Sequence, residues 1–130
     1  MNPSLDVSSP ILVVDAANVV GSRPDGWWRD RRGANKRLRD ALADVGSRGV
    51  EDAPPPVSVV LVVEGAARGI ASSATVDVID APASGDDRIV EYVASADRPC
   101  IVVTADRELR RRVTALGARV VGPRSVQSPR

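Results

Sequence analysis

Short apolar runs rich in valine and isoleucine recur along the chain, and each is followed by a more polar segment. The run at residues 11–15 is continuously apolar up to its last residue, as expected for a strand buried on both faces of a parallel sheet. We expect further strands at residues 57–63, 75–80, 101–104 and 118–121, the third of them weaker because polar residues alternate within it.

Segments between these runs carry apolar residues at helical spacing, with arginines outside the apolar stripe. The first predicted helix lies within residues 30–45 and would end at Gly46, and the last would end near Gly117. Three consecutive prolines make residues 47–56 a loop. The apolar positions are Leu38, Leu42 and Val45 in the first helix, Ile89, Val90 and Val93 in the second, and Leu109, Val113 and Leu116 in the third.

Strands that alternate with helices predict right-handed crossovers and a three-layer α/β/α sandwich around a parallel sheet. If the strands follow the common doubly wound scheme, their order is 3-2-1-4-5. At 130 residues and 43% hydrophobic content, the chain is expected to form one domain with its own core. Residues 1–10 and 124–130 are expected to be flexible tails.

Acidic residues stand where several of these runs stop. Asp15, Glu64 and Asp106 follow the first, second and fourth predicted strands, and Asp86 opens the helix after the third. Because the ends of parallel strands line one edge of the sheet, these acids are expected to converge there. A cluster of carboxylates suits Mg²⁺ or Mn²⁺, hard ions that activate water and neutralise phosphate charge.

Each acid also has a purely structural interpretation. Asp106 precedes a helical pattern and is equally placed to cap it. Asp87 stands three residues after Ser84, a spacing typical of a capping box, so Asp87 is expected to cap the helix and is kept as an additional metal ligand only in second place. Asn18, three residues after Asp15, either orients that carboxylate or caps the next segment.

Composition removes several classes of chemistry. The chain has no histidine and one cysteine, Cys100, which excludes Ser/His/Asp and Cys/His nucleophilic sites, histidine-bound zinc and an internal disulfide. Neither a Walker phosphate loop nor a dinucleotide fingerprint is present. No apolar run approaches the roughly twenty residues that cross a bilayer, and the first ten residues lack a secretory apolar core, so we expect a cytoplasmic protein without a membrane partner. Seventeen arginines against one lysine indicate a GC-rich bacterial genome.

Four segments together resemble the NYN branch of the PIN-like ribonucleases, including the YacP-like group: VVDAANVVGS, VVLVVEG, SGDDRIVEYV and VVTADRELRRRVTALGARVVGP. The resemblance spans residues 11–123 and implies a PIN-like fold and a metal-dependent ribonuclease that hydrolyses phosphodiester bonds in RNA. Carried over to this chain, the motifs give Asp15 and Asn18, Glu64, Asp86 and Asp106 as catalytic residues, with Asp15, Asp86 and Asp106 as Mg²⁺ or Mn²⁺ ligands. Glu64 stands where relatives often carry aspartate.

RNA is the expected partner, and a homodimer is left open. Two crowded basic regions could hold a phosphate backbone on either side of an acidic cleft, although such runs are equally typical of solvated helix faces. Trp27 could stack a base, but plain packing is the favoured interpretation. The RNA-binding candidates are Arg31, Arg32, Arg110, Arg111, Arg112 and Trp27. The alternative function is a catalytically inactive PIN-like module that binds RNA or a protein.

Overall fold

The computed structural model describes residues 9–23, 26–50 and 53–126. Its centre is a five-stranded sheet in which all paired strands are parallel, in the order β3-β2-β1-β4-β5, which confirms the predicted topology. Val13 in the central strand is paired with Val60 on one side and Val102 on the other. The strands are β1 Ile11–Asp15, β2 Ser58–Val63, β3 Asp77–Asp80, β4 Cys100–Val103 and β5 Arg119–Val121.

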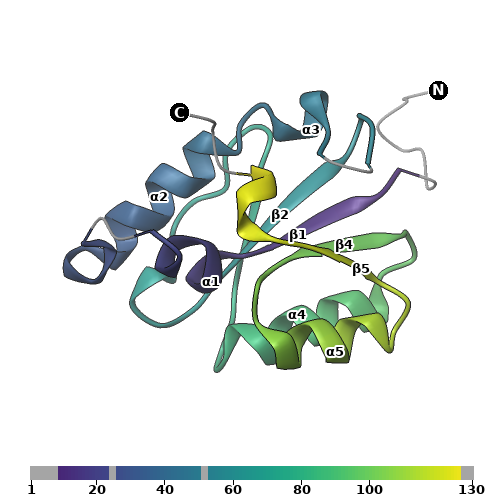
Figure 1. The fold of residues 1–130 in the computed structure, drawn as a ribbon. Coiled ribbons are helices and arrows are strands. Elements are labelled where there is room, and N and C mark those ends of the chain that lie inside the picture. Colours follow the sequence, from purple (N-terminus) through teal and green to yellow (C-terminus); the bar gives the residue numbers. More distant parts are fainter. Residues whose placement is uncertain (1–8, 24–25, 51–52, 127–130) are drawn as a thin grey trace.

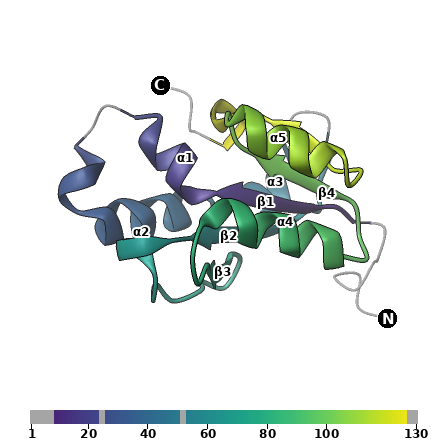
Figure 2. The ribbon, with the colours of Figure 1, turned by 90° about the horizontal axis from the view of Figure 1, so that it is seen from below.

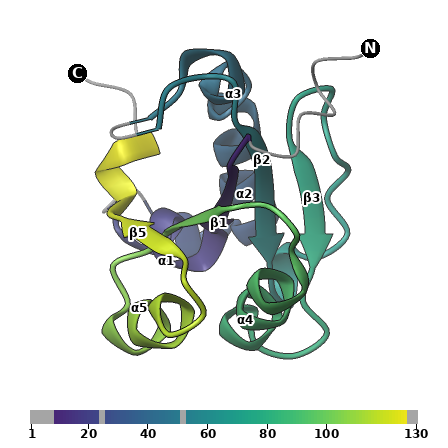
Figure 3. The ribbon, with the colours of Figure 1, turned by 90° about the vertical axis from the view of Figure 1, so that its right-hand side faces the viewer.

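Helices cover both faces of the sheet and complete the predicted three layers (Figure 1, Figure 3). One face carries α1 (Ala16–Gly21), α2 (Arg31–Ala41) and α3 (Val45–Arg48), and the other carries α4 (Gly85–Ser95) and α5 (Arg107–Thr114). Short 3-10 helices occur at η2 (Trp27–Arg29), η3 (Gly65–Ala67) and η4 (Pro123–Val126). Figure 2 shows α1 directly at the end of β1.

The core explains why the central strands are continuously apolar. Leu12 and Val14 pack into the layer of α2 and α3, where Leu42 is fully buried. Ile11 and Val13 point the opposite way, into the layer of α4 and α5. Successive residues of a strand face opposite sides of the sheet, so a sheet covered on both faces needs apolar residues at every position.

The first predicted helix differs from the structure at its end. It divides into α2 and α3, and Gly46 lies inside α3 instead of ending a helix. A Cβ at residue 46 would lie 2.7 Å from the carbonyl oxygen of Val57, so glycine is there for close helix-to-strand packing. In α5 the regular helix stops at Thr114, and Leu116 is 47% exposed instead of packing in the core.

The structured part of the chain extends into both predicted tails. Val126 is buried in the core at the end of η4, and the carbonyl oxygens of Ser9 and Pro10 accept hydrogen bonds from Arg98 and Ser58. The remaining tail residues, 1–8 and 127–130, lie outside the described residues. Within the described part of the chain, no helix has the length and apolar character needed to cross a membrane.

Candidate active site at the carboxyl edge of the sheet

Asp15 is the buried centre of the candidate site. It is the last residue of β1 and the N-cap of α1, and it is only 4% exposed. Its Oδ1 accepts the backbone N–H of Asn18 at 3.4 Å, and its Oδ2 accepts the hydroxyl of Thr104 at 2.9 Å. A carboxylate held this way has a fixed orientation at the end of the central strand.

Thr104 and Asn18 tie the loop after β4 to the end of β1. The Thr104 hydroxyl, fully buried, accepts the backbone N–H of Asp106 at 3.1 Å while it donates to Asp15. The Asn18 side-chain oxygen accepts the backbone N–H of Ala105 at 2.8 Å. Asn18 is therefore not a cap: it lies inside α1, its backbone N–H helps to orient the Asp15 carboxylate, and its side chain fixes the neighbouring loop.

Asp106 caps α5, since its Oδ1 accepts the N–H of Leu109 at 2.8 Å. Glu64 reaches from the end of β2 to the first turn of α4, where its Oε1 accepts the N–H of Gly85 at 2.9 Å. A Cβ on Gly85 would overlap that same oxygen, so only glycine permits this approach. Hydrogen bonds therefore link β2 to α4 and β4 to α5 beside Asp15.

Burial and neighbouring acids raise the pKa of Asp15 and of Asp86. The pKa of Asp15 is raised to about 6, first by burial and then by the charges of Asp86 and Glu64, while the hydrogen bonds from Thr104 and Asn18 act in the opposite direction. The pKa of Asp86 is also raised, first by burial and then by the charges of Asp106 and Glu64. The structure therefore brings Asp15, Glu64, Asp86 and Asp106 into one electrostatic neighbourhood at this edge.

The donor set suits a hard divalent cation, because it consists of carboxylate oxygens whose mutual repulsion a cation would relieve. Among the residues that the structure describes, however, no three acidic or cysteine side chains are grouped closely enough to hold a metal ion as they stand. Asp15, Glu64 and Asp106 are turned toward backbone or hydroxyl donors. The assignment of Asp15, Asp86 and Asp106 as ligands therefore stays a prediction that requires side-chain rotation.

Among the described contacts, Ser84 and Asp87 form only one half of the expected capping box. The backbone N–H of Asp87 donates to the hydroxyl of Ser84 at 3.1 Å, which is the predicted cap of α4. Its carboxylate forms an ion pair with Arg112 at 3.1 Å. The charge of Asp87 is thus compensated within the protein.

The basic RNA-binding candidates have contacts within the protein. Arg32 donates to the carbonyl oxygens of Arg68 and Gly69, so it anchors the segment after η3. Arg110 donates through Nε to the carbonyl oxygen of Thr104 at 2.8 Å, and Arg111 pairs with Glu108. The guanidinium of Arg31 lies over the ring of Trp27, 5.5 Å from its centroid. RNA contacts by these residues stay a prediction.

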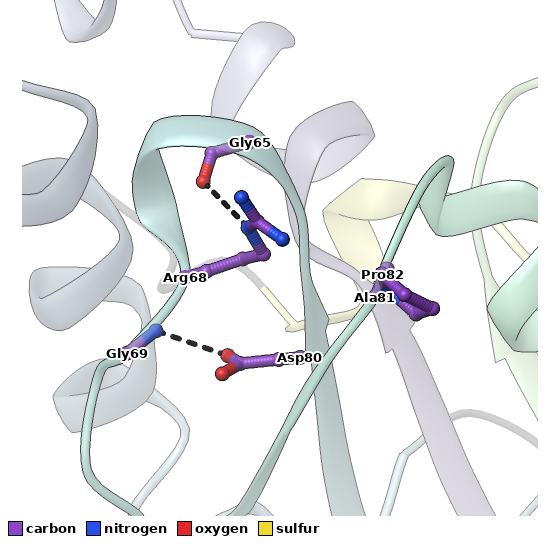
Figure 4. Close-up of a pocket in the computed structure, with 6 residues that line it drawn as sticks. All are labelled: Gly65, Arg68, Gly69, Asp80, Ala81 and Pro82. Atoms are coloured by element: carbon purple, nitrogen blue, oxygen red, sulfur yellow. Dashed lines mark hydrogen bonds between the residues drawn. The ribbon is translucent and has the colours of Figure 1, made fainter.

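An open pocket of about 550 Å³ lies beside the acids, between η3 and the end of β3 (Figure 4). Arg68 folds back so that its Nε donates to the carbonyl oxygen of Gly65 at 3.2 Å, and Asp80 accepts the N–H of Gly69 at 3.0 Å. Ala81 and Pro82 form the opposite wall. The pocket opens the carboxyl edge of the sheet to solvent.

Comparison with solved structures gives two matches to Rae1 (YacP) from Bacillus subtilis. A tryptophan-to-leucine variant of Rae1 superposes with a TM-score of 0.71 at 20% sequence identity, over 90% of this chain and 72% of the other. A second Rae1 structure gives a TM-score of 0.68 at 22% identity, over 89% and 70% of the two chains. This chain has the YacP fold. No family model and no curated protein matches the sequence.

Sequence reasoning missed two residues that shape this site. The sequence predicts Thr104 only as the last residue of the fourth strand, although its hydroxyl joins Asp15 to the backbone of Asp106. Gly85 was passed over, and only its contact with Glu64 explains it. The available signal for Thr104 was its position at the end of an apolar run, because a buried hydroxyl needs a hydrogen-bond partner. Gly85 gave no local signal.

Proposed function

We propose that this chain is a metal-dependent ribonuclease of the PIN-like class, NYN branch, acting on RNA at the carboxyl edge of its sheet. The observation that carries the proposal is Asp15, a carboxylate that is 4% exposed, has a pKa raised to about 6, and lies near the further negative charges of Asp86 and Glu64. Burying unbalanced negative charge is costly, and such sites are typically functional. The sequence resemblance to the YacP-like group and the YacP fold support the same class.

Asp15, Asp86 and Asp106 would hold Mg²⁺ or Mn²⁺. When bound, such an ion lowers the pKa of water and neutralises charge on phosphate. The oxygen of Asp106 that does not cap α5 remains for this purpose, because a carboxylate has two oxygens and about four acceptor sites.

Neighbouring residues position these acids. Thr104 and Asn18 fix the plane of the Asp15 carboxylate, and Thr104 also fixes the backbone from which Asp106 projects. Glu64 holds the first turn of α4, so it controls where Asp86 stands. In this arrangement Glu64 positions α4 and adds negative charge to the site, and it lies at the margin of the site.

The capping contacts also favour a second candidate, an inactive PIN-like module that binds RNA or protein. In that case the hydrogen bonds of Asp15, Glu64 and Asp106 would be the whole role of these acids, and cleavage would be absent.

The test is cleavage of structured and unstructured RNAs by the purified chain with Mn²⁺ or with EDTA. We expect cleavage that depends on Mn²⁺. It should be lost in Asp86→Asn, because this substitution removes one negative charge from the acidic cluster. The matched control is Asp97→Asn, the same change at an exposed residue just before β4, at the opposite edge of the sheet. Cleavage that is equal in both variants, or unaffected by EDTA, would contradict the proposal.

A further inference from the structure

Two of the three aromatic residues of the chain stand together in η2, next to the candidate site rather than in the core. The rings of Trp27 and Trp28 are in edge contact, with centroids 6.1 Å apart and planes at 89°. Trp28 is 54% exposed, with the guanidinium of Arg29 over its ring at 5.8 Å. Exposed aromatic rings with nearby arginines are the usual stacking surface of proteins that bind single-stranded nucleic acid.

A cavity of about 240 Å³ connects this aromatic pair to the acids. Trp27, Arg31 and Asn35 line one side, and Glu64 and Gly65 line the other. The volume is far above the roughly 15 Å³ that holds one water molecule. Gly65 also lines the open pocket of Figure 4, so the two depressions lie side by side along the acidic edge.

Asn35 leaves a hydrogen bond unmade at this cavity. It is 5% exposed, and its amide nitrogen donates to the carbonyl oxygen of Arg31 at 2.7 Å. No donor among the described residues reaches its Oδ1. Buried acceptors are nearly always satisfied in folded proteins. The Oδ1 is shielded as placed, and turning it toward the cavity that the residue lines requires rotation about the soft terminal torsion of asparagine.

We propose that this cavity is a nucleobase subsite, which takes an unpaired base of the RNA strand next to the cleaved phosphodiester. The inference rests on the proposed ribonuclease function and names its substrate as single-stranded RNA. The base stacks on Trp27, its edge donates a hydrogen bond to Asn35, and the adjacent base stacks on the exposed face of Trp28.

The polar groups of the subsite predict which base it prefers. Asn35 Oδ1 and the Glu64 carboxylate are acceptors and the Arg31 guanidinium is a donor, so the best match is an edge with adjacent donors beside a single acceptor. Guanine presents adjacent imino and amino donors, and adenine and cytosine present an amino group. Uracil presents one donor between two carbonyl oxygens, which would face the Glu64 carboxylate. We therefore expect guanine to bind best and uracil worst.

The experiment measures binding separately from cleavage. The probes are short oligouridylates that carry one central G, A, C or U, titrated into Asp15→Asn protein while tryptophan fluorescence is followed. The G probe should quench fluorescence and bind about tenfold more tightly than the U probe, a usual size for base discrimination by hydrogen bonds. In the Asn35→Ala background this difference should shrink, because only the Glu64 carboxylate is left to discriminate between the bases.

Trp28→Ala should weaken all four probes by about 5- to 150-fold, the range of one lost base stack, without changing their order. Leu116→Ala, which removes another exposed apolar side chain far from η2 in sequence, is the matched control and should change nothing. The comparison of the four bases uses the intact cavity, so it does not depend on how any variant of Asn35 folds.

The outcomes separate the subsite from the nuclease. Equal affinity for all four probes, or no binding at all, would overturn the subsite even if wild-type protein cleaves RNA. A preference for G that depends on Asn35, together with an affinity for all four probes that depends on Trp28, in a protein whose wild type cuts no RNA with Mn²⁺, would keep the subsite and overturn the nuclease.

Discussion

Replacing Asp15 by asparagine is predicted to stabilise the metal-free protein near neutral pH and to destabilise it in acid. Burial raises the pKa of Asp15 to about 6 in the folded protein, against 3.8 for an ordinary aspartate. The folded state therefore holds this proton more tightly than the unfolded state. The stability that the folded state gains from this tighter proton binding is fully present below about pH 4, and it is lost as the pH rises through about 6.

The size of the effect follows from the shift. Two pKa units correspond to about 3 kcal/mol at pH 7, since each unit is worth about 1.36 kcal/mol. Asparagine keeps the acceptor for the Asn18 N–H but offers no second oxygen to the Thr104 hydroxyl, which costs about 1 kcal/mol. We therefore expect Asp15→Asn to be about 1 to 2 kcal/mol more stable than wild type at pH 7, and about 1 kcal/mol less stable at pH 4.

The assay is urea unfolding in EDTA, followed by circular dichroism at several pH values between 4 and 7.5. The quantity of interest is the difference in unfolding free energy between variant and wild type at each pH, because other acids titrate in both proteins. Asp97→Asn, the same change at an exposed residue, serves as control and should alter the unfolding free energy at pH 7 less than Asp15→Asn does. A difference for Asp15→Asn that is the same at pH 4 and pH 7 would refute the reasoning from burial.

Two further predictions concern the metal and the contact between Glu64 and α4. Mg²⁺ or Mn²⁺ should raise the melting temperature of wild type, because an ion concentration of one hundred times the dissociation constant adds about 2.7 kcal/mol to the unfolding free energy. The melting temperature of Asp86→Asn should rise less. A melting temperature that neither ion changes would favour the inactive module. Gly85→Ala should destabilise the protein by about 1 kcal/mol because its Cβ would displace Glu64 Oε1 from the Gly85 N–H, and the cost should shrink when Glu64→Ala is added. Additive costs in the double variant would contradict that contact.

The sheet could be predicted from the sequence because burial on both faces demands uninterrupted apolar strands, and such runs are visible without a structure. The convergence of Asp15, Glu64 and Asp106 followed from the strand order alone, since parallel strands end at one edge. Helix α1 was missed. Its sequence, AANVVG, has little apolar periodicity, and Asp15 caps it directly at the end of β1 with no intervening loop.

Features that rest on distant contacts could not be predicted. Arg32 was weighed as an RNA contact, yet its guanidinium lies against carbonyl oxygens 36 and 37 residues further along the chain. Gly46 has the residue type of a helix stop, yet it serves the packing of α3 on Val57. In both cases the local sequence is compatible with either role, and only tertiary proximity decides between them.

Capping and metal binding were weighed against each other for each acid, but the structure makes charge balance the better criterion. Asp87 caps nothing through its side chain in the described contacts, and Arg112 neutralises it at 3.1 Å. Asp106 does cap a helix, yet its charge contributes to raising the pKa of Asp86.

A carboxylate can accept a hydrogen bond from a backbone N–H with one oxygen and still offer the other oxygen to a cation, so an acid that caps a helix can also bind a metal ion. What a purely structural acid does not need is further carboxylates around it. Asp15 and Asp86 each have two or more such neighbours whose charges raise their pKa, and burial strengthens that repulsion. Stability near neutral pH alone would favour asparagine at Asp15, so the aspartate there supports the proposed cation site.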